Sequence, residues 1–240
     1  MSPLPEEWNI PASIRNRLGS TVGRQRVIFE DGHLLLVLHA PAKPDESRRR
    51  GRYFWRSPNG TWKSIATDRP SLTLEEHIDE FDHALEECEQ ADLKAKSSFE
   101  YFDVLEKLAP LQRSGNNMYQ VLQEARKLVQ DDRDIINLRD RCYELTRTAE
   151  LLFTSAKNAL DCTVAREAEK MTQESHKMAV SAHRLNLLVA FFFPIATLSA
   201  IFSTAFESGF EQYAPPLPFL ILVAVGLIFG ILLSLFVTRK

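Results

Sequence analysis

The sequence predicts a mostly α-helical protein with a small antiparallel β-sheet and a membrane hairpin at its C-terminal end. Three observations predict this fold. Two long apolar runs near the C-terminus carry no charge, two strand–turn–strand patterns occupy the first third of the chain, and a helical pattern of about 60 residues has no Pro or Gly before Pro194. Together they predict a cytoplasmic α+β domain and a long stalk helix that continues into the first transmembrane helix.

The two apolar runs predict membrane insertion. Residues 185–206 and 217–237 contain no Asp, Glu, Lys or Arg. About 20 helical residues cross the hydrocarbon core of a bilayer, so each run is long enough to span it. We expect residues 207–216 to form a short outer loop, in which Glu207 and Glu211 are the acidic residues.

The charges that flank these runs predict the orientation of the chain. Lys177 and Arg184 precede the first run, Arg239 and Lys240 follow the second, and the loop between them has neither Lys nor Arg. Cytoplasmic flanks carry the positive excess. We therefore expect an integral protein of an inner or plasma membrane, with the lipid bilayer as a partner and both termini cytoplasmic. The start of the chain lacks a basic segment followed by an apolar one, so we expect no cleaved signal peptide.

Residues 1–132 are expected to form the cytoplasmic domain, 133–184 the stalk and 238–240 a cytoplasmic tail. Asp31-Gly32 and Ser57-Pro58-Asn59-Gly60 supply the turns of two β-hairpins, with strands at residues 27–29, 34–39, 53–56 and 61–65. Trp55 and Trp62 are predicted to pair across the second hairpin. The linker at 41–51 holds the run Arg48 to Arg50, which suits a surface linker or contact with anionic lipid.

Helical patterns fill the rest of the cytoplasmic part. Thr73 and Glu76 have the spacing of a capping box, which predicts a helix over about 73–96. A second helix is predicted over 97–109 with Pro110 as its stop, then a break at 115–117 and a third helix over 118–129. The three cysteines have no CxxC spacing, so we expect neither a zinc site nor a disulfide framework.

The long helical pattern after Asp132 has a heptad rhythm. Its small and apolar residues recur in steps of three and four at Leu138, Cys142, Leu145, Ala149, Leu152, Ala156 and Ala159, and then at Val164, Ala168, Met171, Ser175, Met178, Ala182 and Leu185. Spacing sustained over this length predicts packing against other helices along the whole stalk.

The helix predicted from Thr73 is strongly acidic, with no Lys or Arg between Arg69 and Lys94. Clustered carboxylates are the ligands that hard divalent cations prefer. The residues of a possible regulatory metal site are Glu76, Asp79, Glu80, His83 and Glu87. A solvated acidic face is the competing interpretation.

The order of these elements resembles the CorA family of divalent-cation channels. Pro194, Ile201, Phe202, Phe206 and Glu207 fall where that family has Pro, Ile, an aromatic residue, Phe and Glu. The signature Gly-Met-Asn of the family falls on Ser203, Thr204 and Ala205, and all three differ. The resemblance implies a homo-oligomer, a pentamer in that family, whose first transmembrane helix lines a pore. Mg²⁺ is the expected cargo and a possible regulator, and no cofactor is implied.

In the family, the signature Asn helps to hold a hydrated divalent ion, a role that Ala205 cannot fill with its side chain. The candidate pore and filter residues are Asn186, Phe193, Thr197, Ala200, Ser203, Thr204 and Ala205. The hydroxyls of Thr197 and Thr204 either face the pore or bond back to their own helix. Glu207 and Glu211 either form charged rings at the outer mouth or belong to a solvated loop.

Two functions stay open at this point. The first is a CorA-like channel that passes divalent cations down their gradient, and the second is a non-conducting oligomeric scaffold or metal sensor of the same architecture. The chain has no GxSxG, P-loop, dinucleotide-binding or HExxH motif, so we expect no enzyme. No nucleic-acid partner is expected. Gly226 and Gly230 form a GxxxG pattern that suits close contact between membrane helices.

Overall fold

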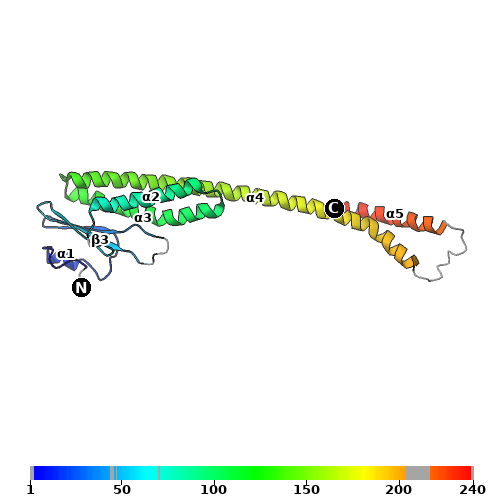
Figure 1. The fold of residues 1–240 in the computed structure, drawn as a ribbon, viewed down its shortest axis with the longest axis horizontal. Coiled ribbons are helices and arrows are strands. Elements are labelled where there is room, and N and C mark those ends of the chain that lie inside the picture. Colours follow the sequence, from blue (N-terminus) through cyan, green and yellow to red (C-terminus); the bar gives the residue numbers. More distant parts are fainter. Residues whose placement is uncertain (1–2, 44–45, 47, 70, 204–216, 239–240) are drawn as a thin grey trace. The chain divides into compact units, whose positions relative to one another are not determined.

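The structure is a computed structural model that describes residues 3–43, 46, 48–69, 71–203 and 217–238. The chain divides into two compact units, Met1–Ala165 and Arg166–Lys240. Its elements, in the order in which Figure 1 colours them, are α1 (Ala12–Asn16), β1 (Arg26–Glu30), β2 (His33–His39), β3 (Gly51–Arg56), β4 (Trp62–Ala66), α2 (Leu74–Lys94), α3 (Ser98–Leu128), α4 (Arg133–Ser203) and α5 (Leu217–Thr238). A mostly helical chain with one small antiparallel sheet and a very long helix confirms the predicted fold class.

The four strands form one antiparallel sheet in the order β1-β2-β3-β4. Asp31 and Gly32 connect β1 to β2 with φ angles of 49° and 77°. This left-handed pair makes the tight turn that was predicted for the first hairpin. β2 is buried on both faces, and residues 34–38 are 0% exposed, as their continuous apolar run predicts.

Alternation along β2 divides the core of the first unit into two clusters. Leu34 and Leu36 pack with Phe81 of α2 and Leu108 of α3. Leu35 and its neighbours on the opposite face pack with the N-terminal segment that contains α1. Figure 1 shows the corresponding layers, with the helices over one face of the sheet and α1 over the other.

The pairing predicted for Trp55 and Trp62 is wrong. Trp55 lies opposite Lys63, and Trp62 lies opposite Arg56. Because side chains alternate along a strand, this register puts the two indole rings on opposite faces of the sheet. Trp55 instead stacks on Trp8 of the N-terminal segment, with ring centroids 5.7 Å apart.

The predicted division at Pro110 and residues 115–117 is also wrong, because α3 runs unbroken from Ser98 to Leu128. A Pro and a Gly inside a helix cost about 3 and about 1 kcal/mol. The helix buries many apolar side chains, each of which contributes roughly 1.5–3 kcal/mol, and these outweigh that cost; they include Val104, Leu108, Leu111, Met118, Val121 and Leu122. Gly115 serves packing, since a Cβ there would lie 3.1 Å from Leu145 Cδ2 of α4.

The helix starts follow local signals. Thr73 and Glu76 form the predicted capping box at α2, and Ser97 and Glu100 form a second one at α3. At the start of α4, a carboxylate oxygen of Asp132 accepts the backbone N–H of Ile135 at 3.2 Å. α4 then continues for 71 residues, past Pro194, which confirms the long helix. Within the first unit Ile135 is buried in the first turn of α4, and the buried positions that follow, Cys142, Leu145, Ala149 and Ala156, belong to the predicted heptad rhythm.

Candidate functional site

The part of α4 in the second unit is the candidate membrane crossing. Among the described residues, α4 is the one helix that passes both the length and the hydropathy test for a span. Its most apolar 18-residue window has a mean hydropathy of 1.7, and the structure buries none of that window. Over the same described residues, α5 contains a shorter apolar stretch, Val223–Leu232.

α5 contacts α4 through the two glycines of the GxxxG pattern. Gly226 and Gly230 are both buried. A Cβ at Gly226 would lie 2.9 Å from Ile195 Cγ1, and one at Gly230 would lie 2.8 Å from the backbone oxygen of Phe191. Both distances are too short for a side chain, so the absence of a Cβ is what allows this approach. The close helix contact predicted from the pattern is confirmed.

Four of the candidate pore residues lie on the exposed surface of α4, namely Asn186, Phe193, Thr197 and Ala200. Thr197 Oγ1 donates a hydrogen bond to the Phe193 backbone oxygen at 2.8 Å. This contact is the one expected if the hydroxyl serves its own helix. Ser203 is the last residue of α4. The remaining candidates, Thr204, Ala205, Glu207 and Glu211, lie outside the described residues.

An apolar stripe follows α4 through the second unit. We define it by its large apolar members, Met171, Met178, Leu185, Val189 and Phe193. Their exposed fractions lie between 54% and 69%. A contiguous apolar surface of this kind marks contact with another protein or with a membrane. The heptad pattern predicts that these residues pack against other helices. In the described part of the structure, the stripe is instead exposed on the surface of the single chain.

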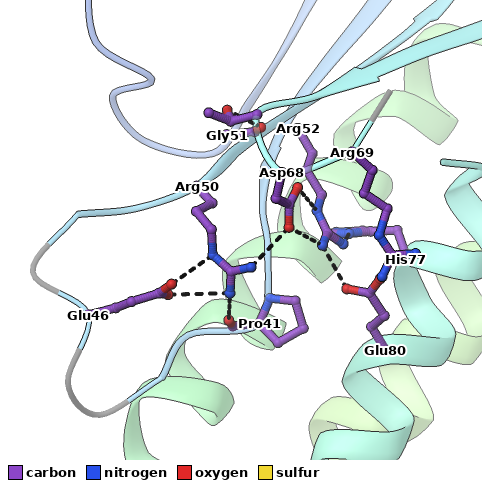
Figure 2. A network of polar contacts seen from close by, with 10 residues as sticks. Pro41, Glu46, Arg50, Gly51, Arg52, Asp68, Arg69, His77 and Glu80 are labelled. Carbon is purple, nitrogen blue, oxygen red and sulfur yellow. Dashed lines mark hydrogen bonds and ion pairs between the residues drawn. The ribbon is translucent and has the colours of Figure 1, made fainter. Parts of the chain in front are cut away.

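The first unit contains a second notable feature, a buried network of charged side chains (Figure 2). Arg52 of β3 is 1% exposed and is held by Asp68 at 2.9 Å and Glu80 at 2.7 Å. Asp68 also binds Arg50 at 2.9 Å, and Glu80 also binds Arg69 at 2.6 Å. Each carboxylate is thus shared by two arginines, which ties the start of β3 and the segment after β4 to α2.

His77 of α2 completes this network and is 0% exposed. Its Nδ1 accepts a hydrogen bond from Arg52 Nη1 at 2.8 Å, and its Nε2 has no partner among the residues that the structure describes. Burial, with the nearby Arg52 charge as a second cause, lowers the pKa of His77 to about 3, so the ring is neutral. Burial by itself would raise the pKa of Asp68, but the hydrogen bond and charge of Arg52 outweigh it and hold that pKa low. The network is a fixed electrostatic link between elements.

Some acidic residues of α2 pair with arginines outside the acidic run. Asp79 binds Arg141 of α4 at 2.5 Å, and Asp82 binds the same guanidinium. The Glu76 side chain belongs to the capping box. His83 and Glu87 lie 3.4 Å apart on the surface.

The predicted regulatory metal residues are therefore distributed among different contacts. The structure pairs Asp79 and Glu80 with arginines and brings His83 next to Glu87. Over the residues that the structure describes, no group of three or more His, Cys, Asp or Glu side chains has the arrangement of a metal site. Metal regulation through α2 stays a prediction.

Sequence reasoning missed Arg52 and Arg141 as partners of the acidic helix. Both come from segments far away along the chain, so no local charge pattern connects them to α2. One signal was available, since Arg52 stands directly before the aromatic run Tyr53-Phe54-Trp55 in the strand GRYFWR. A charged residue that must be buried in a strand requires a partner, and the nearest surplus of opposite charge is the acidic helix.

No protein-family model and no curated protein sequence matches the chain. Its fold is similar to solved structures. The cytoplasmic domain of ZntB from Vibrio parahaemolyticus matches with a TM-score of 0.55 and 11% identity, over 67% of this chain and 80% of that one. Full-length CmaX matches with a TM-score of 0.59 and 12% identity, over 98% of this chain and 82% of that one. The CorA magnesium transporter from Methanocaldococcus jannaschii has a TM-score of 0.45 and 15% identity, over 92% and 80%.

Proposed function

We propose that this chain is the subunit of a homo-oligomeric membrane transporter that passes divalent metal cations, with Mg²⁺ as the first cargo to test. The observation that carries the proposal is α4, a single helix that begins in a polar domain and ends in an uncharged segment with an exposed apolar surface. The resemblance of residues 194–207 to the CorA family and the fold shared with full-length CmaX support the same reading.

Assembly follows from the apolar stripe. Met171 and Met178 lie before the predicted membrane span, so their exposure to water is costly, and copies of the same chain would cover them with the same stripe in a closed ring that continues along Leu185, Val189 and Phe193. The resemblance implies five copies. In that ring the α4 helices would surround the central path, and Phe193 would narrow it as an apolar constriction that gates by dewetting. The bilayer would cover the outward surface of both helices.

Ion selection in this proposal acts on a hydrated cation. Mg²⁺ loses its water shell reluctantly, so a ring that hydrogen-bonds those waters discriminates without stripping them. Ser203 and Thr204 would supply hydroxyls at the outer end of the path, where the family has an amide. Transport would run down the electrochemical gradient, because the chain contains no nucleotide-binding motif.

The second candidate function is a non-conducting oligomeric scaffold or metal sensor of the same architecture. One observation favours it, namely that Ser203, Thr204 and Ala205 replace all three signature residues. The apolar stripe and the α4–α5 contact suit both functions equally, since both require an assembled membrane hairpin.

A flux comparison separates the two functions. The natural chain and a triple variant, Ser203→Gly, Thr204→Met and Ala205→Asn, are placed in liposomes that contain a Mg²⁺-sensitive dye. Flux through the natural chain supports a hydroxyl-lined transporter. Flux through the triple variant alone identifies an assembled pore that lacks a working filter, and therefore the second function. Flux through neither, with the oligomer intact, excludes the transporter.

A further inference from the structure

A cavity of about 270 Å³ lies in the first unit, between the linker that joins β2 to β3 and the middle of α3. Gln25 and His39 line it from the ends of strands β1 and β2, and Arg113, Ser114 and Asn117 line it from α3. The cavity takes no part in the transport proposed above, and a ligand site there is independent of that function.

The floor of this cavity gathers buried polar side chains. Over the described residues, five polar or charged residues are buried, and Arg52 and His77 bond to each other. The other three, Gln25, His39 and Ser114, all line this cavity. Burying a polar group is costly unless it finds a hydrogen-bond partner. Gln25 and Ser114 bond to each other and His39 bonds to the Gly23 backbone, so the floor is a fixed polar surface that suits a polar molecule.

The hydrogen bonds of the floor leave one accessible acceptor. Gln25 Nε2 donates to the Ser114 backbone oxygen at 3.0 Å and its hydroxyl oxygen at 3.2 Å, while Gln25 Oε1 is fully buried and has no partner among the described residues. His39 Nε2 lies 2.9 Å from the Gly23 backbone oxygen and must donate to it, since a carbonyl only accepts. Burial lowers the pKa of His39, so the ring is neutral and its Nδ1 is an acceptor.

The rim of the cavity carries unpaired positive charge. Lys43, Arg48, Arg49 and Arg113 are exposed, and none of them forms an ion pair with a residue that the structure describes. A fifth cation, Arg50, pairs with Glu46 at 2.8 Å. Glu106 is the other carboxylate among the described lining residues, which thus comprise five cations and two carboxylates. The ligand must therefore be an anion that also carries hydrogen-bond donors.

We propose that this cavity binds a small phosphomonoester with free hydroxyl groups, its phosphate at the arginine rim and its hydroxyls at the floor. Guanidinium groups match the oxygens of a phosphate with paired hydrogen bonds, and a phosphomonoester carries close to two negative charges. The volume lies near the lower end for ligand pockets, which suits a pentose phosphate or one lipid headgroup. A soluble sugar phosphate and a phosphorylated inositol headgroup share this chemistry.

Calorimetry on the purified full chain in detergent tests the site, with ribose 5-phosphate, ribose and inorganic phosphate as probes. Ribose 5-phosphate should bind saturably, ribose should not bind, and inorganic phosphate should bind more weakly because it lacks the hydroxyls that the floor requires. Arg113→Gln and Arg49→Gln should each weaken ribose 5-phosphate about tenfold or more, since each removes a charge-assisted contact. Lys127→Gln, at the far end of the same helix, should leave the affinity unchanged.

Nanodiscs distinguish the two sources of the phosphate. If phosphorylated phosphatidylinositol in the disc abolishes ribose 5-phosphate binding, the natural occupant is the lipid headgroup, and if binding persists, the occupant is soluble. Either result upholds the site. Absence of ribose 5-phosphate binding, equal affinity for inorganic phosphate, or rim variants that behave like Lys127→Gln would each overturn the proposal. The variants change exposed side chains, and the tryptophan fluorescence of the sheet reports whether each one is folded.

Discussion

Replacing Arg52 by methionine tests the buried network most sharply. The substitution keeps an unbranched side chain of similar volume to the aliphatic part of arginine but removes a guanidinium that is 1% exposed and holds Asp68, Glu80 and His77. Breaking a buried ion pair from one side costs about 3–5 kcal/mol. Both carboxylates keep a second arginine and are 18% and 25% exposed, so we expect a loss near 3 kcal/mol. For a unit of this size that loss lowers the unfolding midpoint by roughly 6–12 °C.

The natural chain supplies its own probe for this measurement. All three tryptophans, Trp8, Trp55 and Trp62, lie in or against the sheet of the first unit, so fluorescence follows its unfolding in the intact detergent-solubilised protein. The matched control is Arg17→Met, because Arg17 is 58% exposed and pairs with Glu30 at 3.3 Å. An exposed pair contributes less than about 1 kcal/mol. Equal losses in the two variants would refute the role assigned to the network.

Three further predictions concern pH, the α4–α5 contact and assembly. His77→Asn keeps an acceptor for Arg52 but cannot titrate. Because the folded pKa of about 3 lies below the ordinary value of 6.5, the natural protein should lose about 1.4 kcal/mol of stability for each pH unit below 6.5, and the variant should not show this loss. Equal slopes of unfolding free energy against pH in the two proteins would contradict this. Gly230→Leu should place a side chain in steric clash with the Phe191 backbone oxygen and reduce the monodisperse fraction in size-exclusion chromatography. Ile231→Leu, at an exposed position, should leave that fraction unchanged, and similar elution profiles for the two variants would argue against the contact. Met178→Glu should lower the mass of the oligomer measured by light scattering, while Gln173→Glu, about half a turn away from the stripe, should leave that mass unchanged. An unchanged mass for both variants would exclude the stripe as the interface between copies.

Much of the fold was predictable because its signals are local. Asp31-Gly32 permits the left-handed angles of a tight hairpin, the run LLLVL has no polar side to expose, and Thr73 with Glu76 satisfies the first turn of α2. Each of these is decided within a few residues. The sequence therefore sufficed for the sheet, the start of the helical part and the length of α4.

What could not be predicted depends on partners that are distant in sequence. Pro110 normally ends a helix, but the apolar side chains on both sides of it pack into one core and keep α3 continuous. Gly115 looks like a helix break until Leu145 is placed against it. The charges of Asp79 and Glu80 suggested a metal site, yet each pairs with an arginine that is distant in sequence, Asp79 with Arg141 and Glu80 with Arg52. Local patterns give no information on such contacts.

The phosphate cavity illustrates the same limit. Arg48 to Arg50 were visible in the sequence as a basic run, for which a surface linker and a lipid contact were the two readings. Only the fold brings this run next to Arg113 and over the buried Gln25 and His39. Its placement adds a third possibility, a defined site for a soluble or lipid phosphate.

Metal uptake into sealed vesicles tests the central claim most directly. The purified natural chain is reconstituted into liposomes that contain a Mg²⁺-sensitive dye, Mg²⁺ is added outside under an inside-negative potential, and empty liposomes serve as the control. The account predicts uptake that depends on the protein, follows the gradient without ATP, and falls when Phe193→Trp narrows the path. A dye signal no faster than that of empty liposomes, from protein shown to be oligomeric, would contradict it.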